Sequence, residues 1–110
     1  MQFVREVLKR HASDYIDAYV FGSVLSGKTD EYSDVDLLLV RKTELPFFDR
    51  IREIMSLRRE FGNLDLLIYT PEELEGMLSE PGRNFLKNII KAGYRIEGTQ
   101  NRGRTLVEPG

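Results

Sequence analysis

Residues 33–40 of this 110-residue chain read Ser-Asp-Val-Asp-Leu-Leu-Leu-Val. The nearly continuous aliphatic run from Val35 to Val40 is typical of a strand that is buried on both faces of a sheet. Because side chains alternate across a strand, Asp34 and Asp36 point to the same face at its beginning. Aspartate is uncommon in strands, and two carboxylates on one face repel each other and resist desolvation. The stretch therefore predicts a buried strand whose first residues carry an electrostatic cost.

Two interpretations of the aspartate pair stand side by side. A divalent cation would supply the opposite charge, since magnesium prefers oxygen ligands and commonly takes one or two carboxylates together with substrate phosphates. Alternatively, both carboxylates are solvated at the mouth of an edge strand or cap nearby backbone groups. The pair taken alone does not decide between a metal site and a solvated strand end.

A third carboxylate, Asp65, lies near the start of the next aliphatic run, Asn63-Leu64-Asp65-Leu66-Leu67-Ile68. If the two strands pair, Asp65 lies opposite or diagonal to the face that carries Asp34 and Asp36. Three carboxylates at one end of a buried sheet fit a site for two metal ions about 3.5–4 Å apart, which hold the attacking and leaving oxygens. Asp65 would then bind the ion nearest the acceptor and could take the acceptor's proton.

Gly22 and Ser23 follow the preceding predicted strand, Ile16 to Phe21. A glycine at this turn lets the backbone pass close to a ligand, and Ser23 can cap the short helical piece that follows. Unpaired N–H groups at a helix start favour phosphate oxygens, so both residues are candidates for nucleotide binding. A tight strand-to-helix turn with a capping serine is the simpler interpretation, because short motifs often match by chance.

The rest of the chain alternates helices and strands. Apolar residues at spacings of three and four predict helices over residues 3–12, 46–61 and 85–93. Thr70-Pro71-Glu72-Glu73 predicts the start of another helix, since threonine can cap, proline suits the first helical position and Glu73 completes a capping box. Residues 64–69 and 94–96 read as strand or extended chain.

The helix predicted over residues 46–61 has two distinct sides. We expect its apolar stripe to pack on the sheet, and the stripe comprises Phe47, Phe48, Ile51, Ile54, Met55 and Phe61. We expect the arginines of its other side to form a solvated face, with a partner or nucleic-acid contact as the alternative. These arginines are Arg50, Arg52, Arg58 and Arg59.

The alternation of elements predicts an α/β (α+β) fold, with helices packed against a small mixed β-sheet. We expect one domain over residues 1–97. The polar, charged and glycine residues of 98–110 predict a flexible C-terminal tail.

Composition narrows the range of functions. Hydrophobic residues make up 41% of the chain and charged residues 31%, which is ordinary for a globular domain. Sixteen basic and 18 acidic residues give a formal charge of −2, so we expect no general affinity for nucleic acid. Cysteine is absent from the sequence, which excludes disulfides, thiolate metal sites and cysteine nucleophiles. No apolar signal region precedes the first charges, and we expect a cytoplasmic protein without membrane contact.

Phe21-Gly22-Ser23, ten intervening residues and then Asp34-Val35-Asp36 resemble the motif of the DNA-polymerase-β-like nucleotidyltransferase superfamily. The short chain and the Ser-Asp-hydrophobe-Asp form resemble its smallest branch, the minimal nucleotidyltransferases. Asp65 matches the family's third carboxylate, because it follows the Asp-x-Asp strand across one helix. The resemblance covers about residues 1–97, and turn, spacing and carboxylates agree in it.

The resemblance implies a nucleotidyltransferase fold and a role for each matched residue. Gly22 and Ser23 would hold the triphosphate of ATP or another nucleoside triphosphate. Asp34 and Asp36 would bind two Mg²⁺ ions, and Asp65 would bind metal and assist the acceptor hydroxyl. The chain departs from the family in one place: Val24 and Leu25 stand where members often carry a small residue and an arginine, and the next cation is Lys28.

The resemblance also implies a partner. Minimal nucleotidyltransferases are commonly encoded beside small all-helical HEPN proteins, many of which are RNase toxins, so the domain would act as the antitoxin and place AMP on the partner. Larger members carry further domains for the acceptor, and here a second protein or a second copy of the chain would supply it. The alternative is a catalytically inactive nucleotide-binding or toxin-masking subunit. A nucleic-acid polymerase or tRNA-modifying enzyme is disfavoured by the acidic balance.

Overall fold

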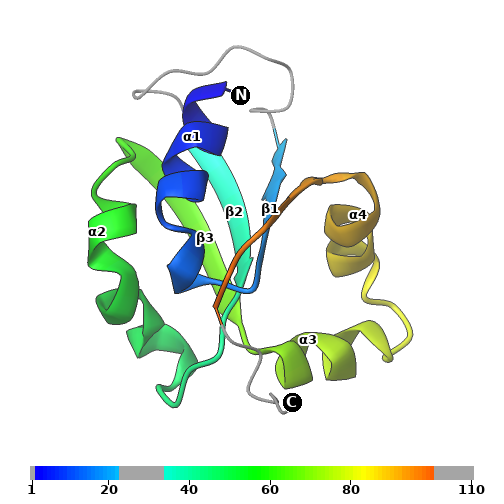
Figure 1. The fold of residues 1–110 in the computed structure, drawn as a ribbon. Coiled ribbons are helices and arrows are strands. Elements are labelled where there is room, and N and C mark those ends of the chain that lie inside the picture. Colours follow the sequence, from blue (N-terminus) through cyan, green and yellow to red (C-terminus); the bar gives the residue numbers. More distant parts are fainter. Residues whose placement is uncertain (1, 23–33, 101–110) are drawn as a thin grey trace, which may run out of the picture.

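The computed structural model describes residues 2–22 and 34–100. In this part of the chain, one four-stranded sheet has the order β3-β2-β1-β4 (Figure 1). The strands are β1 (Asp17–Phe21), β2 (Asp34–Val40), β3 (Asn63–Tyr69) and β4 (Tyr94–Glu97). β1 is antiparallel to β2 and to β4, whereas β2 and β3 are parallel. The mixed sheet with packed helices confirms the predicted α/β class.

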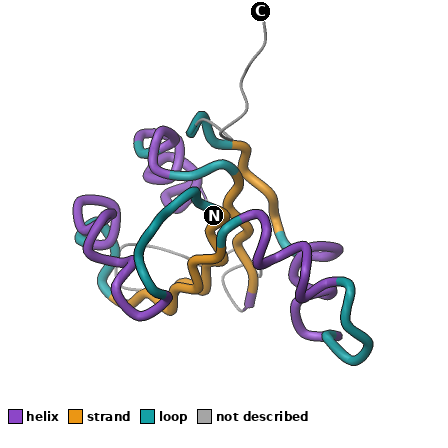
Figure 2. Tube along the Cα trace, turned by 90° about the horizontal axis from the view of Figure 1, so that it is seen from below, coloured by secondary structure: helices purple, strands orange, loops and turns teal. Residues whose placement is uncertain are grey.

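Helices cover both faces of the sheet, and the view from below shows them on either side of the strands (Figure 2). The first face carries α1 (Gln2–Arg10), the 3₁₀ helix η3 (Phe47–Ile54) and α2 (Met55–Arg58). Their buried side chains share a core with alternate residues of the strands, because successive strand residues point to opposite faces. The core members include Val4, Val7, Leu8, Val20, Leu37, Leu39, Ile54, Leu57 and Ile68.

The second face carries α3 (Pro71–Leu78) and α4 (Asn84–Ala92). Its smaller core joins both helices to β1 and β2, with Tyr19, Leu38, Leu74, Leu86 and Ile89 among its members. α3 begins as predicted: Thr70 Oγ1 accepts from Glu73 N at 3.1 Å, and the Glu73 carboxylate accepts from Thr70 N at 3.0 Å. This capping box fixes the direction in which α3 leaves the end of β3.

The helix predicted over residues 46–61 needs correction. Half of it is a 3₁₀ helix, and the predicted apolar stripe is partly exposed: Phe48 has an exposed fraction of 90%, and Phe47 and Met55 of 37%. Ile54 and Phe61 of the stripe are buried as predicted, and Arg50 and Leu57 are buried with them, so that the four follow a spacing of four, three and four. The buried side is therefore rotated by about one residue from the predicted stripe.

A buried arginine explains this rotation. Arg50 forms a two-pronged ion pair with Glu73, at 2.6 and 2.8 Å, and also donates to the Leu45 and Ile68 carbonyls. Charged side chains are buried when they are paired and hydrogen-bonded in this way. The expectation that Arg50 belongs to a solvated face is therefore wrong, and the residue instead joins η3 to α3.

Backbone hydrogen bonds continue past β4. Gly98 N donates to the Ile16 carbonyl, Thr99 N to Ala12 and Gln100 N to Tyr15. The tail predicted to begin at residue 98 is thus bound to the fold through Gln100, and residues 101–110 lie outside the described part. None of the helices in the described ranges is both long and apolar enough to span a bilayer.

Candidate functional site

The pairing of two parallel strands brings the predicted carboxylates together. The register places Asp36 beside Asp65, and Asp34 beside Asn63. Alternation puts Asp34, Asp36 and Asp65 on the same face as Leu38, which is the face covered by α3 and α4. The sequence predicted that Asp65 lies opposite or diagonal to the pair, and in the structure it lies directly opposite Asp36.

The three carboxylates differ in accessibility. Asp34 and Asp65 are exposed, whereas Asp36 between them is half-buried. Burial raises the pKa of Asp36, and the hydrogen bond with Asp65 and the negative charges of Asp65 and Asp34 raise it further. The raised pKa reflects this burial and the neighbouring negative charges, so a proton or a bound cation would stabilise this end of the sheet.

The backbone at Gly22 packs against the side chain of Asp36. The β1–β2 register pairs Phe21 with Asp36, so the residue after Phe21 leaves the sheet beside this carboxylate. Gly22 has a φ of 82°, and a Cβ on its backbone would overlap the Asp36 carboxylate oxygen Oδ2. Glycine is therefore needed both for the backbone conformation and for the close approach. Ser23, the other predicted nucleotide-binding residue, lies outside the described part of the chain.

We expect Gly22→Ala to lower the free energy of unfolding by about 1–3 kcal/mol, since it combines a strained backbone with a steric overlap. Gly76→Ala is the matched control: Gly76 lies within α3 and a Cβ there meets nothing within 4 Å, so we expect this change to stabilise by about 0.5–1 kcal/mol. Urea denaturation of both variants measures the difference. Equal stability of Gly22→Ala and the wild type would show that the turn accommodates a side chain.

Two hollows flank Asp36. A polar hollow of about 340 Å³ lies on the β3 side and is lined by Asp34, Arg58, Asn63, Leu64 and Asp65. An apolar hollow of about 300 Å³ lies between the end of β1 and α4, and its lining includes Phe21, Gly22, Phe85 and Asn88. The rings of Phe21 and Phe85 meet edge to face with centroids 5.8 Å apart. The carboxylates thus lie between the polar hollow and the apolar hollow.

Sequence reasoning did not place Arg58 and Asn63 at the site. Arg58 was expected on a solvated face, but it is half-buried and lines the polar hollow beside two carboxylates. Within residues 2–22 and 34–100, its guanidinium makes a long hydrogen bond of 3.4 Å to the Phe61 carbonyl and no ion pair. The signal in the sequence was its position five residues ahead of Asn63 and seven ahead of Asp65, just before the strand that carries the third carboxylate.

Comparison with known proteins identifies the family. The model of the family "Polymerase beta, Nucleotidyltransferase" matches residues 2–101. The chain belongs to this nucleotidyltransferase family. The match spans the Gly22 turn, both aspartates of β2 and Asp65 on β3.

Among individual proteins, a tRNA-2-methylthio-N(6)-dimethylallyladenosine synthase from Buchnera aphidicola subsp. Cinara cedri (strain Cc) is 34% identical to the chain over 90 residues. The alignment covers 78% of this chain and 20% of that protein, so the chain spans about a fifth of that relative's length. No solved structure matches the chain.

The residues of this site fit magnesium when the metal is shared with a substrate. Among the described residues, no group of three or more histidine, aspartate or glutamate side chains is placed to hold a metal ion by itself. Magnesium, however, is usually bound through one or two carboxylates, with water and substrate phosphates completing the shell. Asp36 and Asp65 are paired across the two parallel strands, and together they offer the carboxylate oxygens that such binding needs.

Proposed function

We propose that the chain is a magnesium-dependent nucleotidyltransferase that moves AMP from ATP to a hydroxyl group of a partner protein. The observation that carries the proposal is the direct pairing of Asp36 with Asp65, with Gly22 packed against Asp36. A strand end that served only the fold would not need acidic side chains beside each other at a cost in charge repulsion. The family match supports nucleotidyl transfer in general.

Each residue has a proposed role. The backbone N–H groups of Gly22 and Ser23 would bind the triphosphate, since such turns favour phosphate oxygens. Asp34 and Asp36 would hold magnesium on the nucleotide side, and Asp65, which is exposed, would hold it on the acceptor side. Magnesium, when bound, neutralises charge on the entering and leaving oxygens.

The proposed transfer forms one bond to phosphorus, breaks another and moves one proton. The acceptor oxygen forms a bond to the α-phosphorus, and the bond from that phosphorus to the oxygen bridging to the β-phosphate breaks. Pyrophosphate leaves with the electrons of that bond. Asp65 takes the acceptor's proton, because it is exposed at the polar hollow and lies on β3, across from the Asp34/Asp36 pair of β2. Arg58 lines the same hollow and would stabilise negative charge there.

We further propose that the partner is a small helical HEPN-type protein and that the chain acts as its antitoxin in the cytoplasm. This follows the resemblance of the Ser-Asp-hydrophobe-Asp motif to that of minimal nucleotidyltransferases. Residues 2–22 and 34–100 form the sheet and the helices that cover it. The acceptor hydroxyl would therefore come from outside these residues.

The test uses the chain co-purified with the product of the neighbouring gene and ATP labelled on either the α- or the γ-phosphate. We expect the partner to acquire label from α-labelled ATP alone, in magnesium and not in EDTA, with a mass increase of one AMP unit. Label from the γ-position would contradict nucleotidyl transfer. ATP binding without any labelled product would identify a nucleotide-binding or toxin-masking subunit instead.

A further inference from the structure

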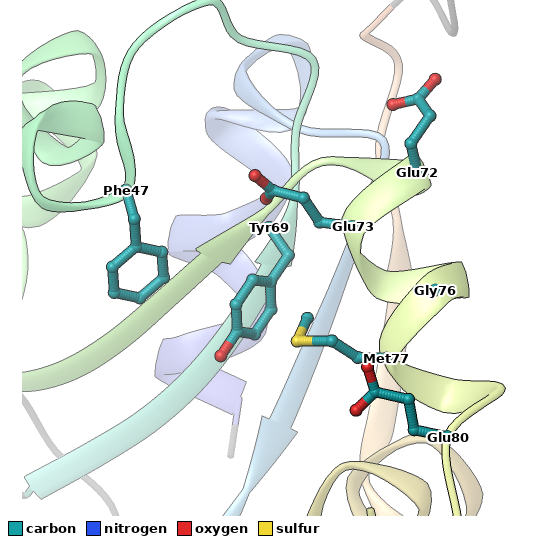
Figure 3. Close-up of a pocket in the computed structure, with 7 residues that line it drawn as sticks. All are labelled: Phe47, Tyr69, Glu72, Glu73, Gly76, Met77 and Glu80. Atoms are coloured by element: carbon teal, nitrogen blue, oxygen red, sulfur yellow. The ribbon is translucent and has the colours of Figure 1, made fainter.

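A second pocket lies on β3 away from the carboxylates. It has a volume of about 440 Å³ and lies between η3, the end of β3 and α3 (Figure 3). Its floor is apolar: Figure 3 shows the ring of Tyr69 between Phe47 on one side and Met77 on the other. The Phe47 and Tyr69 rings are stacked, with centroids 5.5 Å apart and planes at 28°.

A buried ion pair supports the aromatic floor of this pocket. The Arg50 side chain, which belongs to η3, is paired with Glu73 of α3, and its guanidinium carbon lies 5.8 Å from the centroid of the Phe47 ring. The hydrogen bonds from Arg50 lower the pKa of Glu73 to about 2, so the pair stays charged at neutral pH. The pocket is therefore a preformed hollow between two connected elements.

The charge of the lining favours a cation. Among the residues that the structure describes, three glutamates and no lysine, arginine or histidine line the pocket. Glu73 is neutralised by Arg50, but Glu72 has no ion pair or hydrogen bond within the described ranges. Glu80 pairs at 2.9 Å with Arg83, and both of these side chains are about half exposed, so this surface pair contributes little and can exchange.

The position of the pocket relates it to the carboxylate site. Tyr69 and Asp65 are four residues apart on β3, so alternation places them on one face. A strand rises about 3.3 Å per residue, which puts their Cα atoms about 13 Å apart. An extended peptide covers this distance in about four residues.

We propose that this pocket binds a lysine or arginine side chain of the partner polypeptide and so delivers the acceptor hydroxyl to Asp65. The alkyl stem would lie on Tyr69, Phe47 and Met77, and the charged head would reach Glu72 or Glu80, which lie near opposite ends of α3 (Figure 3). Arginine is a frequent anchor in protein interfaces, where a few buried contacts carry most of the affinity. The delivery half of this inference rests on the proposed transfer function, whereas binding of the side chain does not.

Gly76 is a position in the pocket lining at which a side chain can be introduced. It lines the pocket, and a Cβ built on it meets nothing within 4 Å. Gly76→Trp is designed to fill the hollow with a bulky side chain, and Gly76→Ala is its control. The probe is N-acetyl-arginine N-methylamide, with the neutral N-acetyl-glutamine N-methylamide beside it, and the readout is the Met77 methyl resonance, with that of Met55 as internal reference.

We expect the arginine probe to shift the Met77 signal saturably and the glutamine probe to bind at least about tenfold more weakly. Gly76→Trp should abolish the shift, Gly76→Ala should retain it, and both variants should keep wild-type ATP affinity. Equal shifts from the two probes, or none from the arginine probe, would overturn the cation site. Failure of the wild type to bind ATP would count against the proposed function and leave the probe result unaffected.

Delivery is tested with the peptide acetyl-Arg-Ala-Ala-Ala-Tyr-amide and its glutamine-for-arginine version. With α-labelled ATP, the arginine peptide should be labelled at least about tenfold faster, and Gly76→Trp should remove the difference. Equal labelling of the two peptides, or labelling of neither, would overturn the delivery role.

Discussion

Asp65→Asn is expected to lower the rate of nucleotidyl transfer by about 10²–10⁴-fold, the range usual for a positioned base. We expect ATP affinity to stay close to that of the wild type, because Asp34 and Asp36 remain on β2 beside the Gly22 turn. A change that lowers the chemical step more than substrate binding marks an interaction made mainly in the transition state. The measurement compares single-turnover transfer with ATP binding in the same preparation.

Two controls make the Asp65 result specific. Asn63→Ala removes another polar residue that lines the same hollow and carries no charge, and we expect a smaller loss. Asp34→Asn should reduce ATP binding and transfer together. Transfer by Asp65→Asn at the wild-type rate would show that Asp65 is only a strand-end residue.

Asp36→Asn is expected to abolish both metal-dependent ATP binding and transfer while leaving the fold intact. Burial and the neighbouring carboxylates raise the pKa of Asp36 in the folded protein above its ordinary value. The stability linked to this group is therefore fully present below the unfolded pKa and is lost as pH rises through the folded pKa. The asparagine variant has no such loss, so in metal-free buffer at pH 7 its melting temperature should equal or exceed that of the wild type.

Thermal unfolding in EDTA between pH 3 and pH 8 checks the stability part of this prediction. The wild-type curve should fall relative to that of Asp36→Asn as pH rises across the titration of the carboxylate. A variant that melts lower than the wild type at pH 7 would show that Asp36 is a structural residue whose repulsion is already compensated.

The arrangement of the three aspartates could be predicted because its signals are local and strand-based. The run from Val35 to Val40 specifies a strand by apolarity alone, and period-two alternation then fixes the face of Asp34 and Asp36. The position of Asp65 needed one further assumption, that two aliphatic strands separated by a helix lie side by side. The register of β2 and β3 confirms this assumption for Asp36 and Asp65.

The segment from Phe47 to Arg58 could not be predicted because long-range contacts override its local pattern. The six apolar residues of the predicted stripe suggest a buried side, but the ion pair between Arg50 and Glu73 turns a charged residue inward and leaves Phe48 exposed. The residues around Arg50 do not indicate that it pairs with Glu73, because the two are 23 residues apart in the sequence. The same rotation brings Arg58 to the polar hollow. The expectation of a solvated arginine did not indicate this position. The expectations for Ser23 and Lys28 fall outside the described residues.

Calorimetric titration with ATP, in magnesium and in EDTA, tests most directly whether the carboxylates of β2 and β3 hold a nucleotide through a divalent ion. The wild-type chain should bind ATP in magnesium and lose that binding in EDTA, and Asp36→Asn should bind in neither. Binding of equal strength in both buffers, or binding by Asp36→Asn that matches the wild type in magnesium, would contradict a metal-dependent nucleotide site at Asp34, Asp36 and Asp65.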